Sequence, residues 1–281
     1  MQKSNLYVIV FTAIVTIVFG GLLALAAVGL GPAQKKNREL DAKKKILGAV
    51  IELQPTDDVI AIYNKRIKSL VVDINGNEKG EDIIAEEVNI GKEFKKPPEE
   101  RLFPVFKYYS ENDPDKVEAY IINLYGNGLW DRIWAYLALE NDLNTIKGIV
   151  FDHKGETPGL GARITDKEVQ QRFIGKKLYD DLSSTFNKTG MKRKLISVKI
   201  LRGEGRKIPE DNYHEVDGLS GATMTTKGMN KMMMKYLGYY ENYFNKVLEM
   251  QKEQERTETY KTDSVSTDML QLMNDTIRSL Q

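Results

Sequence analysis

Hydrophobic and polar positions divide the chain into one long apolar run and a much longer mixed segment. Residues 6–31 are almost wholly apolar and carry no charged side chain. About 20 such residues are enough for a helix to cross a bilayer. A cleaved signal peptide is the alternative, since Ala24-Leu25-Ala26 resembles a processing site; however, the apolar core of such a peptide is usually only about 7–15 residues long. We therefore expect a retained transmembrane helix over 6–31, after a short N-terminal segment, 1–5.

The region after the apolar run shows helical and then strand-like spacing. Apolar residues at helical spacing over 40–53 predict a stalk or first domain helix, and we assign 32–66 to this part. Residues 67–74 read as a strand, and Asn75-Gly76 is a strong signal for a hairpin turn. Residues 82–111 are polar and contain prolines, so we expect an irregular excursion on the surface.

The rest of the chain predicts an α+β domain over 67–245, with an antiparallel sheet and flanking helices. Residues that favour strands recur between Gly and Asn punctuation, and longer helical patterns follow them. The expected elements are strands at 117–125, 132–139, 145–151 and 194–201, and helices at 166–179 and from about 226 to 253. The polar C-terminal extension, 246–281, is low in aromatic residues, and we expect it to be loosely ordered.

Composition excludes several classes of function. The 41 basic and 40 acidic residues balance, whereas a nucleic-acid-binding protein usually has a net basic surface. The chain has no cysteine, which excludes disulfides, thiolate zinc sites, cysteine-ligated iron–sulfur clusters and thiol nucleophiles. With only His153 and His214, a multi-histidine metal or haem centre is not expected. Any redox chemistry would therefore depend on an organic cofactor.

The segment richest in candidate chemistry is 217–226, DGLSGATMTT. Gly218, Gly221 and Ala222 allow a ligand to approach the backbone closely, and the threonines stand at the start of an expected helix. A helix N-terminus favours phosphate through its free N–H groups and partial positive charge, so a threonine here could hold a phosphate or be esterified to one. Ordinary helix capping by these hydroxyls is the alternative, and spacing alone leaves both open.

Two segments resemble the FMN-binding domain family. SGATMT at 220–225 is similar to its S-G-A-[ST]-x-T motif, and ETPGLG at 156–161 is similar to a second segment that lies against the flavin. The resemblance implies that FMN is joined to Thr225 by a phosphoester, added by a flavin transferase that uses FAD. Without the first motif, the second would read as a plain hairpin loop. The cofactor contacts that the resemblance implies come from Ser220, Gly221, Ala222, Thr223, Glu156, Thr157, Gly159, Leu160 and Gly161.

A third segment narrows the resemblance. GNGLW at 126–130 and IWAYLAL at 133–139 resemble the C-type subunit of the sodium-translocating NADH:quinone reductase. The G-type subunit of the Rnf ferredoxin:NAD complex, which shares the flavin motif, is one alternative. A membrane-anchored assembly module without redox activity, whose threonine loop only caps a helix, is another. Trp130 and Trp134 also fit ordinary core or interface aromatics. The resemblance covers the chain to about residue 243.

This third resemblance implies an electron relay inside an enzyme complex. Its FMN would pass on electrons that originate at NADH, towards quinone, while the complex exports sodium. The expected partners are the other subunits of the sodium-translocating NADH:quinone reductase, the flavin transferase during maturation, and the membrane, with no nucleic acid. No residue is expected to act as a general acid or base on an organic substrate, and no metal site is expected.

The resemblance also places the protein in the bacterial cytoplasmic membrane, with its soluble domain on the extracytoplasmic side. Flanking charge indicates the opposite orientation, because cytoplasmic segments are usually rich in lysine and arginine. Only Lys3 and the terminal amine precede the apolar run. Long domains can cross the membrane largely regardless of such charges, so we follow the resemblance. The basic residues that follow the run are Lys35, Lys36, Arg38, Lys43, Lys44 and Lys45.

Overall fold

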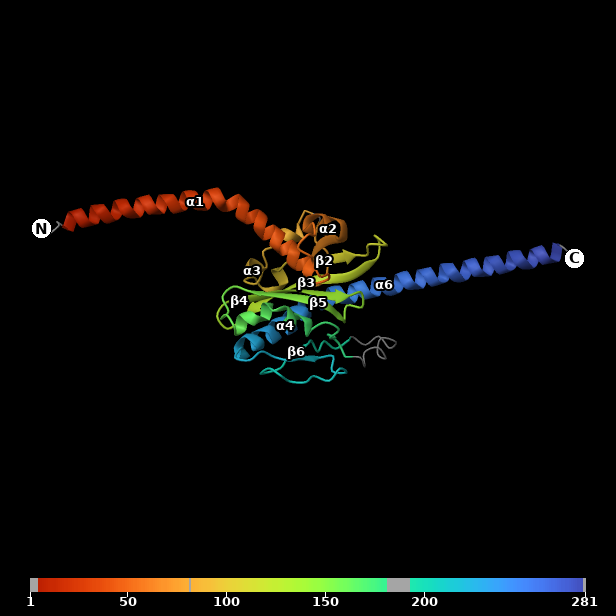
Figure 1. Ribbon diagram of the computed structural model, residues 1–281. Coiled ribbons are helices and arrows are strands. Elements are labelled where there is room, and N and C mark those ends of the chain that lie inside the picture. The colour runs from red at the N-terminus through yellow and green to blue at the C-terminus, as the bar shows by residue number, and fades with distance from the viewer. Residues whose placement is uncertain (1–4, 81, 181–192, 280–281) are drawn as a thin grey trace.

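Five antiparallel strands, each hydrogen-bonded to the next one in sequence, form the centre of the fold (Figure 1). The computed structural model describes residues 5–80, 82–180 and 193–279. The α+β class and the antiparallel sheet expected from the sequence are confirmed. The strands are β1 (Ile67–Val72), β2 (Phe103–Tyr109), β3 (Val117–Asn127), β4 (Arg132–Glu140) and β5 (Ile146–His153).

Helices cover both faces of this sheet, because its strands carry apolar side chains on both sides. On one face, Ile121 of β3 packs with Ile46 and Leu47 at the end of α1 (Asn5–Gly48) and with Tyr63 of α2 (Val59–Arg66). On the other face, Ile122 packs in the larger core with α6 (Thr223–Ser279). The short helices η3 (Gly161–Thr165) and α4 (Lys167–Gln171) complete that second layer. The sheet is therefore the middle of three layers.

Helix α1 joins the apolar run to the domain without a break. The apolar part of α1 has a mean hydropathy of 2.7 over 18 residues, and none of these residues is buried within the protein. The helix is long and apolar enough to span a membrane. Pro32 lies inside the helix, and Figure 1 shows α1 changing direction part-way along, as expected where a proline removes a helical hydrogen bond. Our division of the chain at residues 31 and 66 stays a prediction.

Lys45 fastens the end of α1 to the sheet. Its ammonium lies 2.5 Å from Asp152 of β5 and 2.5 Å from Asp41 one turn earlier. The helix then ends at Gly48, before the predicted end at residue 53, and glycine is a common helix terminator.

Downstream, the turn predicted at Asn75-Gly76 is confirmed, with Gly76 at φ +71°.

The prediction for 82–111 was wrong in one respect, because this excursion ends in a core strand. Five of the seven residues of β2 are buried, the first four of them in succession, so the strand lacks the alternation that marks a half-exposed strand. Ahead of it, the segment forms only single turns of helix. These turns are η1 (Ala85–Glu87), α3 (Ile90–Glu93) and η2 (Pro98–Glu100).

Three further predicted elements differ in length or kind. The helix expected over 166–179 ends at Gln171, and Gly175 follows at φ +76°. The strand expected over 194–201 is reduced to β6 (Lys199–Ile200), paired in parallel with β7 (Glu215–Val216). Ser197 has φ 68°, which interrupts an extended strand. The tail that we expected to be loosely ordered is instead the continuation of α6 to Ser279; no glycine or proline follows Gly238 to stop the helix.

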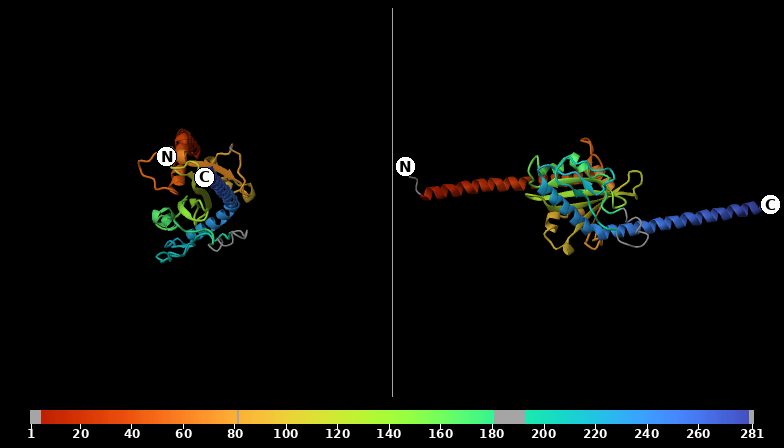
Figure 2. Two further views of the ribbon diagram at one scale, coloured as in Figure 1. Left: turned by 90° about the vertical axis from the view of Figure 1, so that its right-hand side faces the viewer. Right: turned by 90° about the horizontal axis from the view of Figure 1, so that it is seen from below.

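The two long helices leave the domain in opposite directions. Figures 1 and 2 show α1 projecting from one end and α6 from the other. The start of α6 and the loop after β5 lie at the end towards which α1 projects (Figure 1). Both sequence segments with flavin-like motifs therefore lie at this one end of the sheet.

Candidate functional site

Glu156 is the centre of the candidate site, in the loop that follows β5. Its side chain is buried, with 4% of the residue exposed. One carboxylate oxygen, Oε1, accepts hydrogen bonds from the backbone N–H groups of Leu129 (2.8 Å) and Trp130 (3.0 Å), in the turn between β3 and β4. The other oxygen, Oε2, accepts a hydrogen bond from the Thr225 hydroxyl, with 2.5 Å between the two oxygen atoms. The carboxylate thus joins two loops and the first turn of α6.

Thr225 is part of α6 and does not cap it. The helix begins at Thr223, three residues before the predicted start, and the Thr226 N–H donates to the carbonyl of Ala222 at 2.9 Å. Thr225 is 1% exposed, and its hydroxyl donates to Glu156, whereas a capping hydroxyl would accept a backbone N–H. The capping interpretation of this hydroxyl is therefore wrong.

Gly161 allows the two flavin-like segments to meet. A Cβ at this position would lie 2.5 Å from both Glu156 Oε2 and Thr225 Oγ1, closer than non-bonded atoms tolerate. Gly221 makes the second contact between the segments: its φ is +69°, and a Cβ there would lie 2.6 Å from Leu160 Cδ2. Both positions therefore require glycine for the loops to close on one another.

Glu204 holds the rim of the site through ion pairs that the sequence analysis did not find. The two carboxylate oxygens of Glu204 each accept a hydrogen bond from the Arg163 guanidinium, with N···O distances of 2.8 Å. Arg172 donates a further hydrogen bond to Glu204 Oε1 at 3.1 Å. Hydrogen bonds from Arg163 first, then from Arg172 and the Ser220 N–H, lower the pKa of Glu204 to about 2. Glu204 stands between Gly203 and Gly205, in a stretch without a recognisable motif. The contacts tie the loop before α6 to the segment after Gly161.

Known protein families and solved structures match this architecture. The model of the FMN-binding domain family matches residues 128–238. NqrC, the C-type subunit of the Na(+)-translocating NADH-quinone reductase, is 30% identical in Vibrio anguillarum, over 84% of the chain and 90% of that relative. Its counterpart in Vibrio campbellii is 32% identical, with the same coverage. The chain belongs to the NqrC family.

Two crystal structures of NqrC proteins share the fold. The protein from Parabacteroides distasonis is 30% identical, with a TM-score of 0.61 over 75% of the chain and 94% of that protein. NqrC of Shewanella oneidensis is 26% identical, with a TM-score of 0.63 over 75% of the chain and 98% of that protein. The resemblance seen in the sequence is thereby confirmed, and NqrC is preferred to the Rnf relative.

The site of this NqrC family member has a buried floor and an exposed rim. Among the residues predicted to contact FMN, Glu156, Gly161 and Ala222 are buried, as is Thr225 itself. The exposed ones are Thr157, Gly159, Leu160, Ser220, Gly221 and Thr223. The structure brings the predicted segments together, and their individual contacts with a flavin stay predictions.

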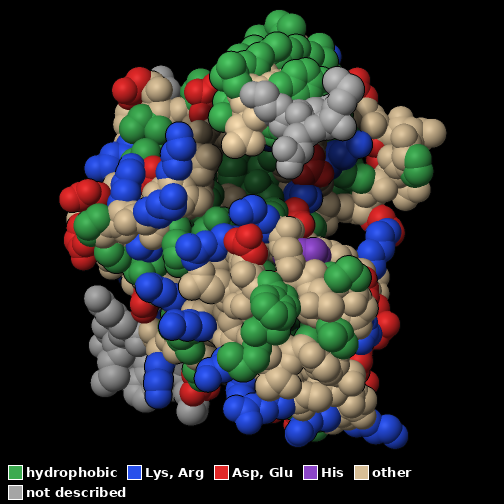
Figure 3. Space-filling model, turned by 90° about the vertical axis from the view of Figure 1, so that its left-hand side faces the viewer, with side chains coloured by type: hydrophobic (Ala, Val, Ile, Leu, Met, Phe, Trp, Pro, Cys, Tyr) green, Lys and Arg blue, Asp and Glu red, His purple; other side chains and the backbone are tan. Residues whose placement is uncertain are grey.

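Apolar side chains stand exposed around the same site. Trp130 is 71% exposed, and its indole N–H donates to the Thr157 hydroxyl at 3.0 Å. Leu129, Leu160 and Met224 are exposed as well, and Figure 3 shows hydrophobic side chains gathered on this end of the domain. Trp134, by contrast, stacks on Tyr125 within the domain, with 6.4 Å between the ring centroids. Trp130 therefore belongs to the site, and Trp134 to the packing of the sheet.

Closure of the loops gives a first prediction: Gly221→Val is expected to reduce flavin loading severalfold while the domain stays folded. A β-branched residue at φ +69° is strained by about 1–3 kcal/mol, and the side chain would displace Leu160. Gly175→Val is the matched control, because Gly175 has φ +76° and nothing within 4 Å of the added Cβ. In-gel flavin fluorescence, with thermal melting of both variants, checks the prediction. Equal loading of the two variants would contradict it.

Proposed function

We propose that this chain is the FMN-carrying electron-relay subunit of a Na(+)-translocating NADH:quinone reductase, with FMN esterified through its phosphate to Thr225. Membership of the NqrC family and the match to the FMN-binding domain support the complex and the cofactor. The observation that supports Thr225 as the attachment residue is the hydrogen bond from its hydroxyl to buried Glu156. FMN supplies carriage of one or two electrons when bound.

The residues around Thr225 fit a flavin mononucleotide. A phosphate esterified to Thr225 would lie in the first turn of α6, where free N–H groups and the helix dipole favour an anion. The exposed apolar side chains of Leu160, Trp130 and Met224 offer contacts for a flat ring at the rim. Glycine at positions 159, 161 and 221 keeps side chains out of the space between the loops.

Glu156 is proposed to accept the Thr225 proton when the phosphoester forms. Thr225 Oγ1 would attack the phosphorus of the FMN half of FAD, bound to a flavin transferase. A P–O bond to threonine would form, the P–O bond to the AMP half would break with AMP as the leaving group, and the hydroxyl proton would pass to Glu156 Oε2, which already accepts the threonine hydroxyl. The backbone N–H groups of Leu129 and Trp130 hold this carboxylate in place.

Attachment also requires the site to open. Thr225 is only 1% exposed, so a transferase cannot reach its hydroxyl in the closed arrangement. Leu160 and Gly221, which lie in contact where the two loops meet, are both exposed, and local opening of such contacts costs less than global unfolding. The loops are therefore proposed to part for the transferase and to close again over the product.

The intact mass of the full-length protein tests the proposed function. Co-expressed with its flavin transferase, the protein is expected to be heavier than its amino-acid sequence by one esterified FMN. Its band on a denaturing gel should fluoresce under ultraviolet light. A colourless band of unmodified mass would reject the covalent relay and leave only a membrane-anchored module.

The orientation of the domain is a second prediction: we expect it on the extracytoplasmic side of a bacterial cytoplasmic membrane. The chain has no cysteine, so Glu99→Cys, at an exposed residue of η2, introduces a single thiol. A membrane-impermeant maleimide should label this variant in intact spheroplasts to the same extent as in lysed ones. Labelling only after lysis would place the domain in the cytoplasm, as the flanking lysines indicate.

A further inference from the structure

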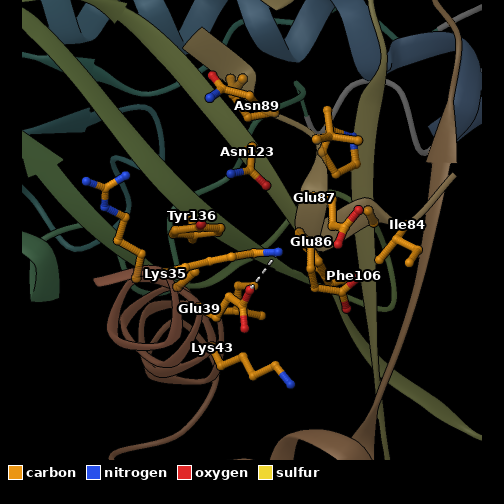
Figure 4. A pocket seen from close by; sticks show the side chains of 17 residues that line it. Lys35, Glu39, Lys43, Ile84, Glu86, Glu87, Asn89, Phe106, Asn123 and Tyr136 are labelled. Atoms are coloured by element: carbon orange, nitrogen blue, oxygen red, sulfur yellow. Dashed lines mark ion pairs between the residues drawn. The ribbon is translucent and has the colours of Figure 1, made fainter. Parts of the chain in front are cut away.

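A recess separate from the proposed flavin site lies between α1 and the sheet. Its volume is about 730 Å³. Its walls come from residues 35–46 of α1, from residues 84–90, and from the middle of β2, β3 and β4. Figure 4 shows the side chains that line it, and Figure 3 shows the surface hollowed beneath α1. The recess therefore faces the side towards which the apolar part of α1 projects.

Asn123 of β3 presents an unpaired acceptor at the floor of this recess. The residue is 6% exposed, and among the described residues no donor reaches its Oδ1. Burial raises the pKa of the neighbouring Tyr136, and a hydrogen bond between this tyrosine and the Asn123 side chain opposes that rise. Buried acceptors are nearly always satisfied, by protein, water or ligand. A ligand of this recess is therefore expected to bring a hydrogen-bond donor.

Charges of both signs stand at the rim of the recess. Lys35, Arg38 and Lys43 of α1 line one wall, and Glu87 lines the other. Lys35 is paired with Glu39 on its own helix at 3.8 Å, between exposed side chains. Such a long, solvent-exposed pair holds its partners weakly. A ligand that carries both a negative and a positive group can therefore displace water here and pair with both walls.

The Lys35 end of the recess stands at the level of lipid headgroups if residues 6–31 span the membrane. At about 1.5 Å per helical residue, Lys35 is about 6 Å beyond the end of the apolar run. The headgroup layer on each side of a bilayer is about 5–8 Å thick. Ile46 and Phe106, which line the interior of the recess, are buried apolar residues. The recess is thus polar at its rim and apolar deeper down.

We propose that this recess binds a phospholipid headgroup that combines a phosphate with a primary ammonium group, as phosphatidylethanolamine does. Lys35 and Arg38 pair with the phosphate. The ammonium donates to Asn123 Oδ1 and pairs with Glu87. Choline has no N–H group and leaves the acceptor unpaired, so the site discriminates between the two headgroups. The proposal depends on membrane insertion of α1 and is independent of the flavin.

Native mass spectrometry of the full-length, delipidated protein in detergent tests the proposal. The probes are dioleoyl phosphatidylethanolamine and dioleoyl phosphatidylcholine, titrated separately. The ethanolamine lipid is expected to bind about tenfold more tightly, the value of one hydrogen bond to a buried acceptor. Asn123→Leu should reduce this ratio to about one. Asn64→Leu, at an exposed position of α2, is the matched control and should leave the ratio unchanged.

A second variant keeps the test decisive if Asn123→Leu does not fold. Glu87→Gln, at an exposed position, should weaken binding of the ethanolamine lipid severalfold, and the exposed control Glu99→Gln should not. Equal affinity for the two lipids, or a preference that survives both changes, would overturn the proposal. Displacement of the lipid by free phosphoethanolamine at equal concentration would also overturn it, because the site would then take a soluble ligand.

Discussion

Thr225→Ala is expected to abolish covalent flavin attachment while the domain stays folded. The change removes the hydroxyl that would be esterified, and among the described residues Thr225 is the only side chain that donates to Glu156 Oε2. It also leaves Glu156 Oε2 without its threonine donor, which costs roughly 1–3 kcal/mol for a buried acceptor. Native domains usually have about 5–15 kcal/mol of stability, so the variant should remain folded with a lowered melting temperature.

Neighbouring threonines are the controls for this result. Thr223→Ala removes an exposed hydroxyl, and Thr226→Ala removes a buried hydroxyl that has no partner among the described residues; both should load flavin as the unaltered protein does. Thr225→Ser keeps a hydroxyl next to Glu156 and should retain attachment. The measurements are intact mass and peptide mapping after co-expression with the flavin transferase. Full loading of Thr225→Ala, or FMN mapped to position 223 or 226, would refute the assignment.

Glu156→Gln is expected to slow flavin attachment by about 10²–10⁴-fold, the usual contribution of a general base. Glutamine has nearly the shape of glutamate, and its oxygen can still accept the N–H groups of Leu129 and Trp130. It cannot take a proton from the Thr225 hydroxyl. The site should therefore form but react slowly. The rate is measured with purified unmodified protein, FAD and the transferase.

The time course separates this role from a structural one. A slow reaction that ends at full loading shows that Glu156 acts on the rate of bond formation. Glu168→Gln, at an exposed residue of α4, provides the control and should react at the normal rate. A normal rate for Glu156→Gln would remove Glu156 from the proposed chemistry, leaving Thr225 as the attachment residue.

The sequence pointed to the two segments that the structure brings together at the candidate site, but not to the contacts between them. Motif spacing pointed to Thr225 and to the ETPGLG segment, yet it could not decide between a cap and a tether. The contact on which our proposal rests joins Thr225 to Glu156, which are 69 residues apart in the chain, and a short sequence motif does not reveal a contact between such distant positions. Glu204 was missed for the same reason: its partners, Arg163 and Arg172, become neighbours only after the loops fold back.

In the fold, too, elements marked by local sequence patterns were predicted, whereas features that depend on distant contacts were missed. β3 and β4 were predicted because strand-favouring residues recur there between turns. β2 was missed because five of its seven residues are buried, four of them in succession, so the alternation is lost. Ser197 at φ 68° shortened the expected strand at 194–201, and a backbone angle of this kind in a non-glycine residue depends on tertiary packing.

The uninterrupted course of α6 makes its far end a sensitive reporter of domain movement. Val247 is buried against the domain, and the helix continues to Ser279, a projection of about 50 Å at 1.5 Å per residue. A rotation of the domain by about 10° would swing a spin label at the tip through roughly 9 Å on such an arm. Pulsed dipolar spectroscopy between this tip and the membrane surface would therefore register reorientations too small to alter the contacts inside the domain.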